Sequence, residues 1–194
     1  MRIIDAPQYG PMFRFTDASV YWALHVLSDG KRMGRKRLAD EVGVGEGSMR
    51  RILNTLKDNN FVDIKQTGIT ITRAGLAYLS DLPIRVIDAD ASKIVLGEFS
   101  QAVLVKGVSE FIDNGLKQRD AGIRVGALGC TTLVMRSGEL ILPPDWSVDK
   151  NEPEVAENLK SVSNMVDGDI IIIGSADDKI SAINAALIAA FELF

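Results

Sequence analysis

With 194 residues, 46% of them hydrophobic and 25% charged, the chain is long enough for two small domains and too apolar to be disordered by default. The net charge of −4 is unevenly divided: residues 1–80 hold 12 Lys or Arg and 8 Asp or Glu, a net +4, whereas residues 81–194 hold 10 and 18, a net −8. The single cysteine, Cys130, excludes an intrachain disulfide and a cysteine zinc cluster, and the single histidine, His25, leaves few other metal sites.

The N-terminus lacks the charged-then-apolar pattern of a signal peptide, and no apolar run approaches the ~18 residues of a membrane span. We therefore expect a cytoplasmic protein with neither export nor membrane insertion. Residues 1–15, which include Pro7, Pro11 and the apolar run around Met12, Phe13 and Phe15, are predicted to form a loop-like arm that docks on its own domain or on a second subunit.

The first predicted helix starts at a cap from Thr16 or Asp17 and ends at Asp29-Gly30. His25 lies beside its apolar face without a cysteine or acidic partner within sequence reach, so we interpret it as a packing or surface residue. A basic cluster follows around the start of the next helix: Lys31, Arg32, Arg35, Lys36 and Arg37. We predict that it contacts phosphates, in preference to forming an ordinary solvent-exposed face.

Two helices joined by a tight break are predicted after Gly34 and before Asn59-Asn60. The first carries Leu38, Ala39 and Val42 at helical spacing, Gly43 ends it, and residues 44–47 form the break. In the second helix one apolar stripe must face the core: Met49, Ile52, Leu53 and Leu56. The opposite face then exposes side chains that can meet bases or phosphates, since arginine pairs with guanine and asparagine with adenine: Ser48, Arg50, Arg51 and Asn54.

A small hairpin and a closing helix complete this unit. Residues 61–65 and 69–71 read as strands around the turn 66–68, and Thr72 is placed to cap a helix over 73–79. Residues expected to contact the DNA backbone are Arg35, Lys36, Lys65 and Thr67.

The order helix, turn, helix, hairpin, helix, with the pattern LAxxxGVxxxxMRRIL from Leu38 and the pair Thr72 and Gly75, resembles the winged helix-turn-helix domains of prokaryotic transcription regulators. The resemblance covers roughly residues 12–80. It departs at Glu46 and Gly47, which stand where polar, often basic residues are usual. The resemblance implies an N-terminal domain that binds double-stranded DNA.

A domain boundary is predicted between residues 81 and 100, a segment that serves either as a linker or as an extra strand. Beyond it, strands are expected over 101–106, 123–135, 140–142 and 169–173, and helices over 109–119, 152–166 and 177–194. The residues 143–146 are expected to form a loop. The last helix is apolar nearly all round and must be buried, either in the core or in a dimer interface.

The fold class predicted for the whole chain is α+β. The order of elements in residues 101–194 suggests a ferredoxin-like α/β sandwich, with four antiparallel strands and helices on one face. The alternative is a mixed sheet with an extra strand from residues 84–97. We expect this domain to mediate dimerisation or to sense a ligand, with residues 1–80 forming the DNA-binding domain.

Small and hydroxylic residues at strand ends mark two candidate ligand-binding stretches, although simple turn and cap chemistry is the more ordinary explanation of both. The candidates are Gly126, Gly129, Thr131, Thr132, Gly174 and Ser175. Neither stretch matches a phosphate-binding loop. A Cys130 nucleophile would need a histidine base, and His25 lies in the other domain, so we expect no catalytic residues, no metal and no cofactor.

Taken whole, the chain resembles archaeal winged-helix proteins with an uncharacterised C-terminal domain, through the pattern above and through residues 126–132 and 168–176. The resemblance implies a transcription regulator. We expect a homodimer that binds double-stranded DNA and has a possible small-molecule effector. The rivals are a protein-interaction module that uses the winged helix as a docking surface, and a small-molecule-binding or enzymatic C-terminal domain.

Overall fold

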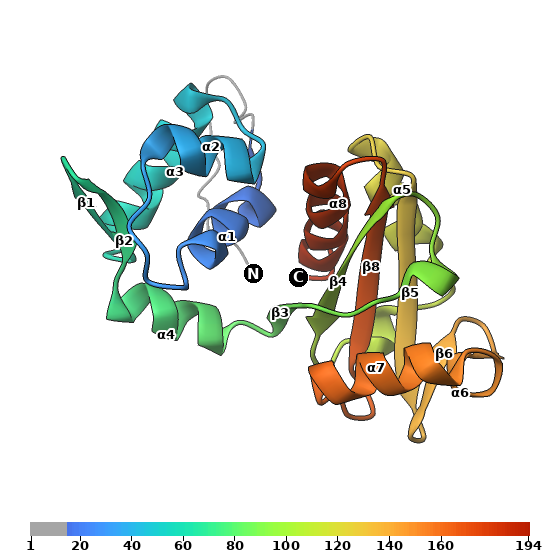
Figure 1. The fold of residues 1–194 in the computed structure, drawn as a ribbon. Helices are drawn as coiled ribbons and strands as arrows, with labels where there is room; N and C mark the ends of the chain where they lie inside the picture. Colours follow the sequence, from blue (N-terminus) through green and yellow to red (C-terminus); the bar gives the residue numbers. More distant parts are fainter. Residues whose placement is uncertain (1–14) are drawn as a thin grey trace. The chain divides into compact units, whose positions relative to one another are not determined.

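The computed structural model describes residues 15–194, and the chain divides into two compact units, Met1–Leu82 and Pro83–Phe194 (Figure 1). The arm expected over residues 1–15 lies outside the described residues except for Phe15, which is buried. Within the described range, no helix is both long enough and apolar enough to cross a membrane.

Three helices form the core of the first unit: α1 (Asp17–Val26), α2 (Arg35–Val42) and α3 (Glu46–Asp58). Gly43 ends α2 in the left-handed conformation, with a φ of 73°, as its position after the apolar run predicted. The apolar stripes expected in the sequence are buried together: Val20, Ala23, Leu24, Leu27, Leu38, Ala39, Val42, Met49, Ile52, Leu53 and Leu56. The helix-turn-helix prediction is therefore confirmed at the level of these elements.

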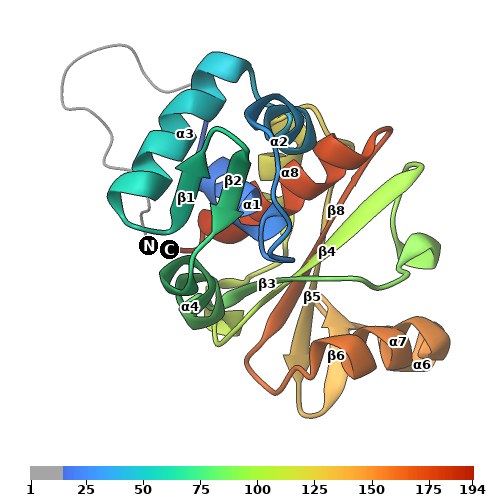
Figure 2. The ribbon, with the colours of Figure 1, turned by 60° about the vertical axis from the view of Figure 1, so that its left-hand side comes forward.

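A hairpin of β1 (Val62–Lys65) and β2 (Gly68–Ile71) follows, and α4 (Arg73–Asp81) closes the unit (Figure 2). The strands pair antiparallel, from Val62 opposite Ile71 to Lys65 opposite Gly68. Met33, from the segment between α1 and α2, forms an isolated antiparallel bridge to Ile69 and so joins the helical core to the hairpin. The expected cap is present, because the Thr72 side chain accepts a hydrogen bond of 3.0 Å from the Gly75 N–H.

The second unit is built on a six-stranded antiparallel sheet with the order β3-β4-β8-β5-β6-β7. Its strands are β3 (Ile84–Ile87), β4 (Phe99–Val105), β5 (Gly129–Arg136), β6 (Glu139–Leu142), β7 (Trp146–Ser147) and β8 (Ile170–Ala176). Its helices are η1 (Ser92–Ile94), η2 (Ser109–Phe111), α5 (Leu116–Arg124), α6 (Val148–Asn151), α7 (Pro153–Ser163) and α8 (Lys179–Phe191). The segment 81–100 thus contributes a strand to this sheet.

Strand β8 lies inside the sheet, between β4 and β5, and begins with four consecutive isoleucines. All seven of its residues are buried. On one face it packs against α8, and there a Cβ on Gly174 would lie 2.1 Å from the carbonyl oxygen of Ala182, so only glycine permits this approach. On the other face Ile171 and Ile173 share a core with Leu159 of α7.

The ferredoxin-like prediction is wrong in two respects. In that topology the third strand of the four, here β6, would lie beside the first, here β4, whereas the strand inserted between β4 and β5 is β8. Helices also cover both faces, α5 and α8 on one and α7 on the other, as expected when the central strand is apolar on both sides. The alternative with a strand from residues 84–97 matches β3, but its mixed sheet does not, since every pairing is antiparallel.

Several boundaries also differ from the prediction. The helix expected over 109–119 is a short η2 followed by α5, because Gly115 takes a φ of 74° and Asn114 caps the N–H of Leu116. The strand expected from residue 123 begins at Gly129, since α5 extends to Arg124. The helix expected over 152–166 begins at Pro153 and ends at Ser163, and the loop expected over 143–146 runs into the edge strand β7.

Candidate nucleic-acid interface

Helix α3 presents two chemically different faces. Met49, Ile52 and Leu56 are fully buried, whereas Arg50, Arg51 and Asn54 are exposed and Ser48 is half-buried. Gly45 precedes the helix in an extended conformation and Glu46 supplies an acid to its first turn, which stabilises the positive end of the helix dipole. Burial of the apolar face therefore turns the polar side chains of α3 toward solvent, as the sequence predicted.

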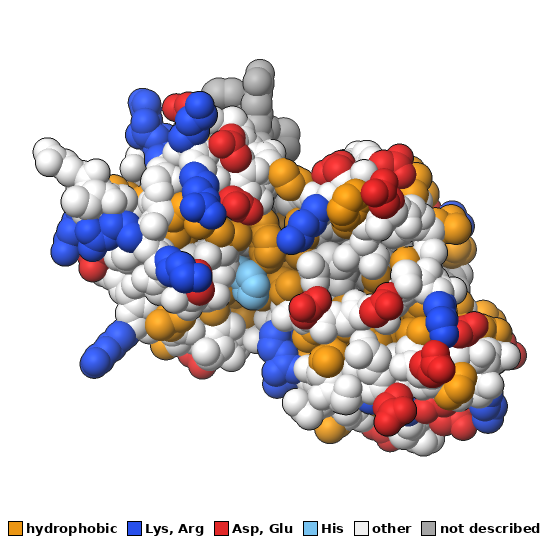
Figure 3. All heavy atoms as spheres, viewed as in Figure 1, with side chains coloured by type: hydrophobic (Ala, Val, Ile, Leu, Met, Phe, Trp, Pro, Cys, Tyr) orange, Lys and Arg blue, Asp and Glu red, His pale blue; other side chains and the backbone are white. Residues whose placement is uncertain are grey.

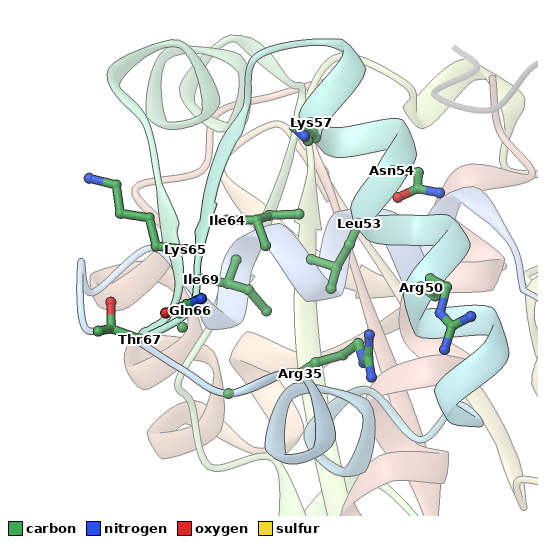
Figure 4. A pocket seen from close by; sticks show the side chains of 12 residues that line it. Arg35, Arg50, Leu53, Asn54, Lys57, Ile64, Lys65, Gln66, Thr67 and Ile69 are labelled. Carbon is green, nitrogen blue, oxygen red and sulfur yellow. The ribbon is translucent and has the colours of Figure 1, made fainter.

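A groove of about 470 Å³ separates α3 from the hairpin. Its floor is apolar, because Leu53 of α3 and Ile64 and Ile69 of the hairpin point toward one another (Figure 4). Polar and cationic side chains border this floor on three elements, namely Arg50, Asn54 and Lys57 on α3, Arg35 at the start of α2, and Lys65, Gln66 and Thr67 on the hairpin.

The groove favours an anionic partner. Of the twelve described residues that line it, four are Lys or Arg and none is Asp or Glu. On the face shown in Figure 3, Lys and Arg side chains gather over the part of the first unit that carries α2, α3 and the hairpin. Cations close together without carboxylates attract phosphates, and guanidinium and amide groups beside them can read base edges. This combination suits a nucleic acid better than a small apolar ligand.

The spacing on α3 sets which side chains face the groove. Arg50, Asn54 and Lys57 follow one another at four and three residues, and so lie along a single stripe of the helix. Arg51 is rotated by about 100° from Arg50 around the helix axis and does not line the groove. Arg50 and Arg51 therefore lie on different sides of α3.

The tip of the hairpin is exposed and carries the remaining predicted contacts. Lys65, Gln66 and Thr67 are exposed, and Lys65 extends from the side of the hairpin opposite to Ile64 (Figure 4). The Thr67 hydroxyl accepts a hydrogen bond from the guanidinium of Arg32. Thr67 is thus engaged within the protein, which the sequence did not indicate.

The structure brings together five of the eight predicted DNA-contacting residues. Those that line the groove are Arg35, Arg50, Asn54, Lys65 and Thr67, and those that do not are Lys36, Ser48 and Arg51. Sequence reasoning missed Lys57 and Gln66 as lining residues. A signal for Lys57 was present, because it continues the stripe of Arg50 and Asn54 by one further turn of α3.

The six ligand-binding candidates of the second unit separate into two groups. Gly129, Thr131 and Ser175 line a shallow cavity of about 350 Å³. The other three do not line it: Gly174 is covered by α8, Thr132 is buried, and Gly126 lies exposed in the turn after α5. Lys93 and Arg119 border this cavity, but each forms an ion pair with a carboxylate, Glu154 and Asp120 respectively.

The groups considered for catalysis lie in unreactive surroundings. Burial raises the pKa of the Cys130 thiol to about 12, which keeps it protonated. His25 stacks on Tyr21 and Trp22 in the first unit. Among the residues described, no three His, Cys, Asp or Glu side chains gather as they would around a metal ion.

The two units match two separate family models. Residues 19–85 match the model described as the CggR N-terminal DNA binding domain, and residues 96–193 match the model described as a domain of unknown function, DUF4443. The chain is also similar to a solved structure, the hypothetical protein PH0730 from Pyrococcus horikoshii OT3, at 26% identity and a TM-score of 0.68, over 90% of this chain and 91% of that chain. No curated protein matches the chain.

The first match places the sequence similarity on the unit that carries the groove. It extends from α1 through the hairpin and α4 into β3, and so includes the described residues that line the groove. The second match covers the sheet from just before β4 to α8. Because the second model matches half of the sequence, the chain belongs to the DUF4443 family, and its first unit is similar to the CggR N-terminal DNA binding domain.

Proposed function

We propose that this protein is a transcriptional regulator that binds double-stranded DNA with α3 in the major groove and the hairpin against the adjacent backbone. The observation that carries this proposal is the groove between α3 and the hairpin, with four cations and no carboxylate among its described lining residues. Helix α3 has 13 residues and is therefore about 20 Å long, and an α-helix with its side chains is about 10–12 Å across, which fits a major groove about 12 Å wide.

Each side chain has a role that follows from its position. Arg50 and Asn54 share the stripe of α3 that faces the groove, and their donors and acceptors suit guanine and adenine edges. Arg35 and Lys57 border the same groove from α2 and from the last turns of α3. They therefore contact the phosphates of the DNA strand that runs between α3 and the hairpin. Ser48, Lys36 and Arg51 contact phosphates on the other side of α3.

We propose further that the protein acts as a homodimer in the cytoplasm and that the second unit dimerises or binds an effector. Support for an interface comes from large apolar side chains exposed on that unit, including Leu96 at 75% and Leu128 at 44% exposure. Support for an effector site comes from the cavity that joins Gly129, Thr131 and Ser175. Helix α8, considered for the interface, packs on β4, β8 and α5 within its own unit.

Selection of bound fragments from genomic DNA at a stated salt concentration tests the central proposal. The affinity of the full chain for a selected duplex is then measured over a series of salt concentrations for the wild type and for R50A/R51A. We expect the double variant to bind about 100-fold more weakly and to lower the slope of log Kd against log salt by about 2, because two cations leave the interface.

The matched control is K106A/K117A, which removes the same charge from exposed positions of the second unit. This control separates a loss of local contacts from a change in net charge alone. Unchanged binding by R50A/R51A, or an equal loss in both double variants, would refute the proposed interface. Retention of a protein partner by the wild type, without any duplex, would favour a protein-docking module instead.

A further inference from the structure

The tip of the β1–β2 hairpin is held by a residue from outside the hairpin. Arg32, in the segment between α1 and α2, donates a hydrogen bond from its guanidinium to the Thr67 hydroxyl, 35 residues along the chain. The stem of the same side chain lies against Gly68, where an added Cβ would be 2.7 Å from Arg32 Cγ. Gly68 therefore makes room for Arg32 beneath the turn.

The hairpin itself does not fix where its tip lies. Each strand has only four residues, and an isolated two-stranded hairpin is marginally stable in water. Val62 and Ile69 anchor it in the core, but Lys65, Gln66 and Thr67 are exposed and bury no side chain. Contacts made by the tip must therefore decide its direction.

Two neighbouring residues supply these contacts. Met33 donates a backbone hydrogen bond of 3.0 Å to Ile69 and accepts one of 2.8 Å from it, which fixes the start of β2. The Arg32 side chain contacts the turn itself, through the Thr67 hydroxyl. Together they connect the wing to the segment that leads directly into α2 and Arg35.

The hydrogen bond to Thr67 does not neutralise the positive charge of Arg32. In the described part of the chain Arg32 forms no ion pair, whereas its neighbour Lys31 is paired with Asp29 at 3.0 Å. A guanidinium has five N–H donors, so a bond to Thr67 leaves donors for a phosphate. Arg32 can therefore hold the wing and still face an anionic strand.

We propose that Arg32 is the positioning residue of the wing: through Thr67 it holds Lys65 and Gln66 beside the groove, so that the wing meets the duplex already ordered. This inference rests on the proposed function. An ordered wing binds more tightly because the entropy of fixing the turn is not lost when DNA binds.

The first arm of the test uses the full chain without DNA. Backbone order parameters of Gln66 and Gly68 are measured by NMR relaxation for the wild type, R32A, T67V and T67S. We expect R32A and T67V to lower the order at both positions, because each removes one partner of the bond, and T67S to retain it. K31A is the matched control, because it removes an adjacent charge that does not contact the wing.

The second arm measures duplex affinity over a series of salt concentrations for the same variants. T67V removes no charge, yet we expect it to weaken binding about 5- to 10-fold and to lower the salt slope by about 1, since Lys65 loses its phosphate. A merely structural role for Thr67 would lower thermal stability without changing that slope. The double variant R32A/T67V should lose less than the sum of the two single losses.

The outcomes separate the two proposals. Wild-type order at Gln66 in R32A, an unchanged salt slope in T67V, or additive losses in the double variant would each overturn the positioning role while leaving DNA binding intact. If the wild type binds no duplex, the proposed function fails and the DNA-binding role of Arg32 fails with it. The order parameters then show independently whether Arg32 orders the wing in the free protein.

Discussion

Thr72 and Gly75 form the hydrogen bond that begins the closing helix of the first unit. The Thr72 hydroxyl accepts from the Gly75 N–H at 3.0 Å and itself donates to the carbonyl of Asn60 at 2.7 Å. Gly75 is buried, and a Cβ there would lie 2.3 Å from the carbonyl oxygen of Phe61. The pair therefore fixes α4 against the end of α3 and the beginning of the hairpin.

Substitution of this pair should destabilise the first unit. We expect T72A to lower the free energy of unfolding by about 1 to 2 kcal/mol, because both bonds of the hydroxyl are lost. G75A should cost about 2 to 3 kcal/mol, because the added methyl group meets backbone atoms that cannot move independently.

The measurement is urea denaturation followed by tryptophan fluorescence in a W146F background, where Trp22 in α1 reports on the first unit. T72S retains the hydroxyl and should match the parent protein. A transition of T72A that coincides with that of T72S would contradict the structural role of the cap.

Asp149 should make the stability of the second unit depend on pH. Partial burial alone would raise the pKa of Asp149, but hydrogen bonds from Lys160 and from the Leu140 N–H outweigh it and lower the pKa below its usual value. A lowered folded-state pKa contributes stability that is complete above the unfolded value of about 3.9 and is lost as the pH falls through the folded value.

We therefore expect D149N to destabilise the second unit at neutral pH and to flatten the acid limb of its stability profile. Fluorescence of Trp146 in a W22F background measures this. D145N removes a carboxylate from the nearby turn and is the matched control for the loss of one negative charge. An identical acid limb in D149N and the parent protein would show that the Lys160 contact contributes nothing.

Cys130 should not react in the folded protein. Burial raises the pKa of its thiol to about 12, so the thiolate needed for attack on a disulfide reagent is scarce at neutral and mildly alkaline pH. We expect one thiol per chain to react with such a reagent in denaturant, and a rate at least about 100-fold lower without it. Fast labelling of the native chain would contradict the buried position and reopen the nucleophile alternative.

The first unit was predictable because its signals are local. The spacing of Leu38, Met49 and Leu53 identifies both helices, and Thr72 identifies the cap of α4 without knowledge of any distant contact. The second unit was only partly predictable. The four isoleucines at residues 170–173 predict a strand covered on both faces. Neither the hydrophobic pattern nor the spacing of the elements predicts that this last strand inserts between β4 and β5.

In the candidate interface too, the sequence predicts local features but not contacts between residues far apart in the chain. Arg50 and Asn54 follow from the face of α3 opposite its apolar stripe, so the sequence alone identifies them. The bond from Arg32 to Thr67 joins residues 35 positions apart, and only the fold brings them together. Among the ligand candidates that do not line the 350 Å³ cavity, Gly174 shows the reverse, because it is small to admit α8 and needs no ligand to explain it.

The most direct test of the interface is NMR chemical-shift mapping of the full chain with a duplex selected from genomic DNA. We expect the largest shifts at backbone amides of Arg50, Asn54, Gln66 and Thr67, with β4 and β8 of the second unit unchanged. Shifts confined to the second unit, or shifts on α3 that spare the groove stripe and the hairpin, would contradict the proposal that a duplex binds between α3 and the wing.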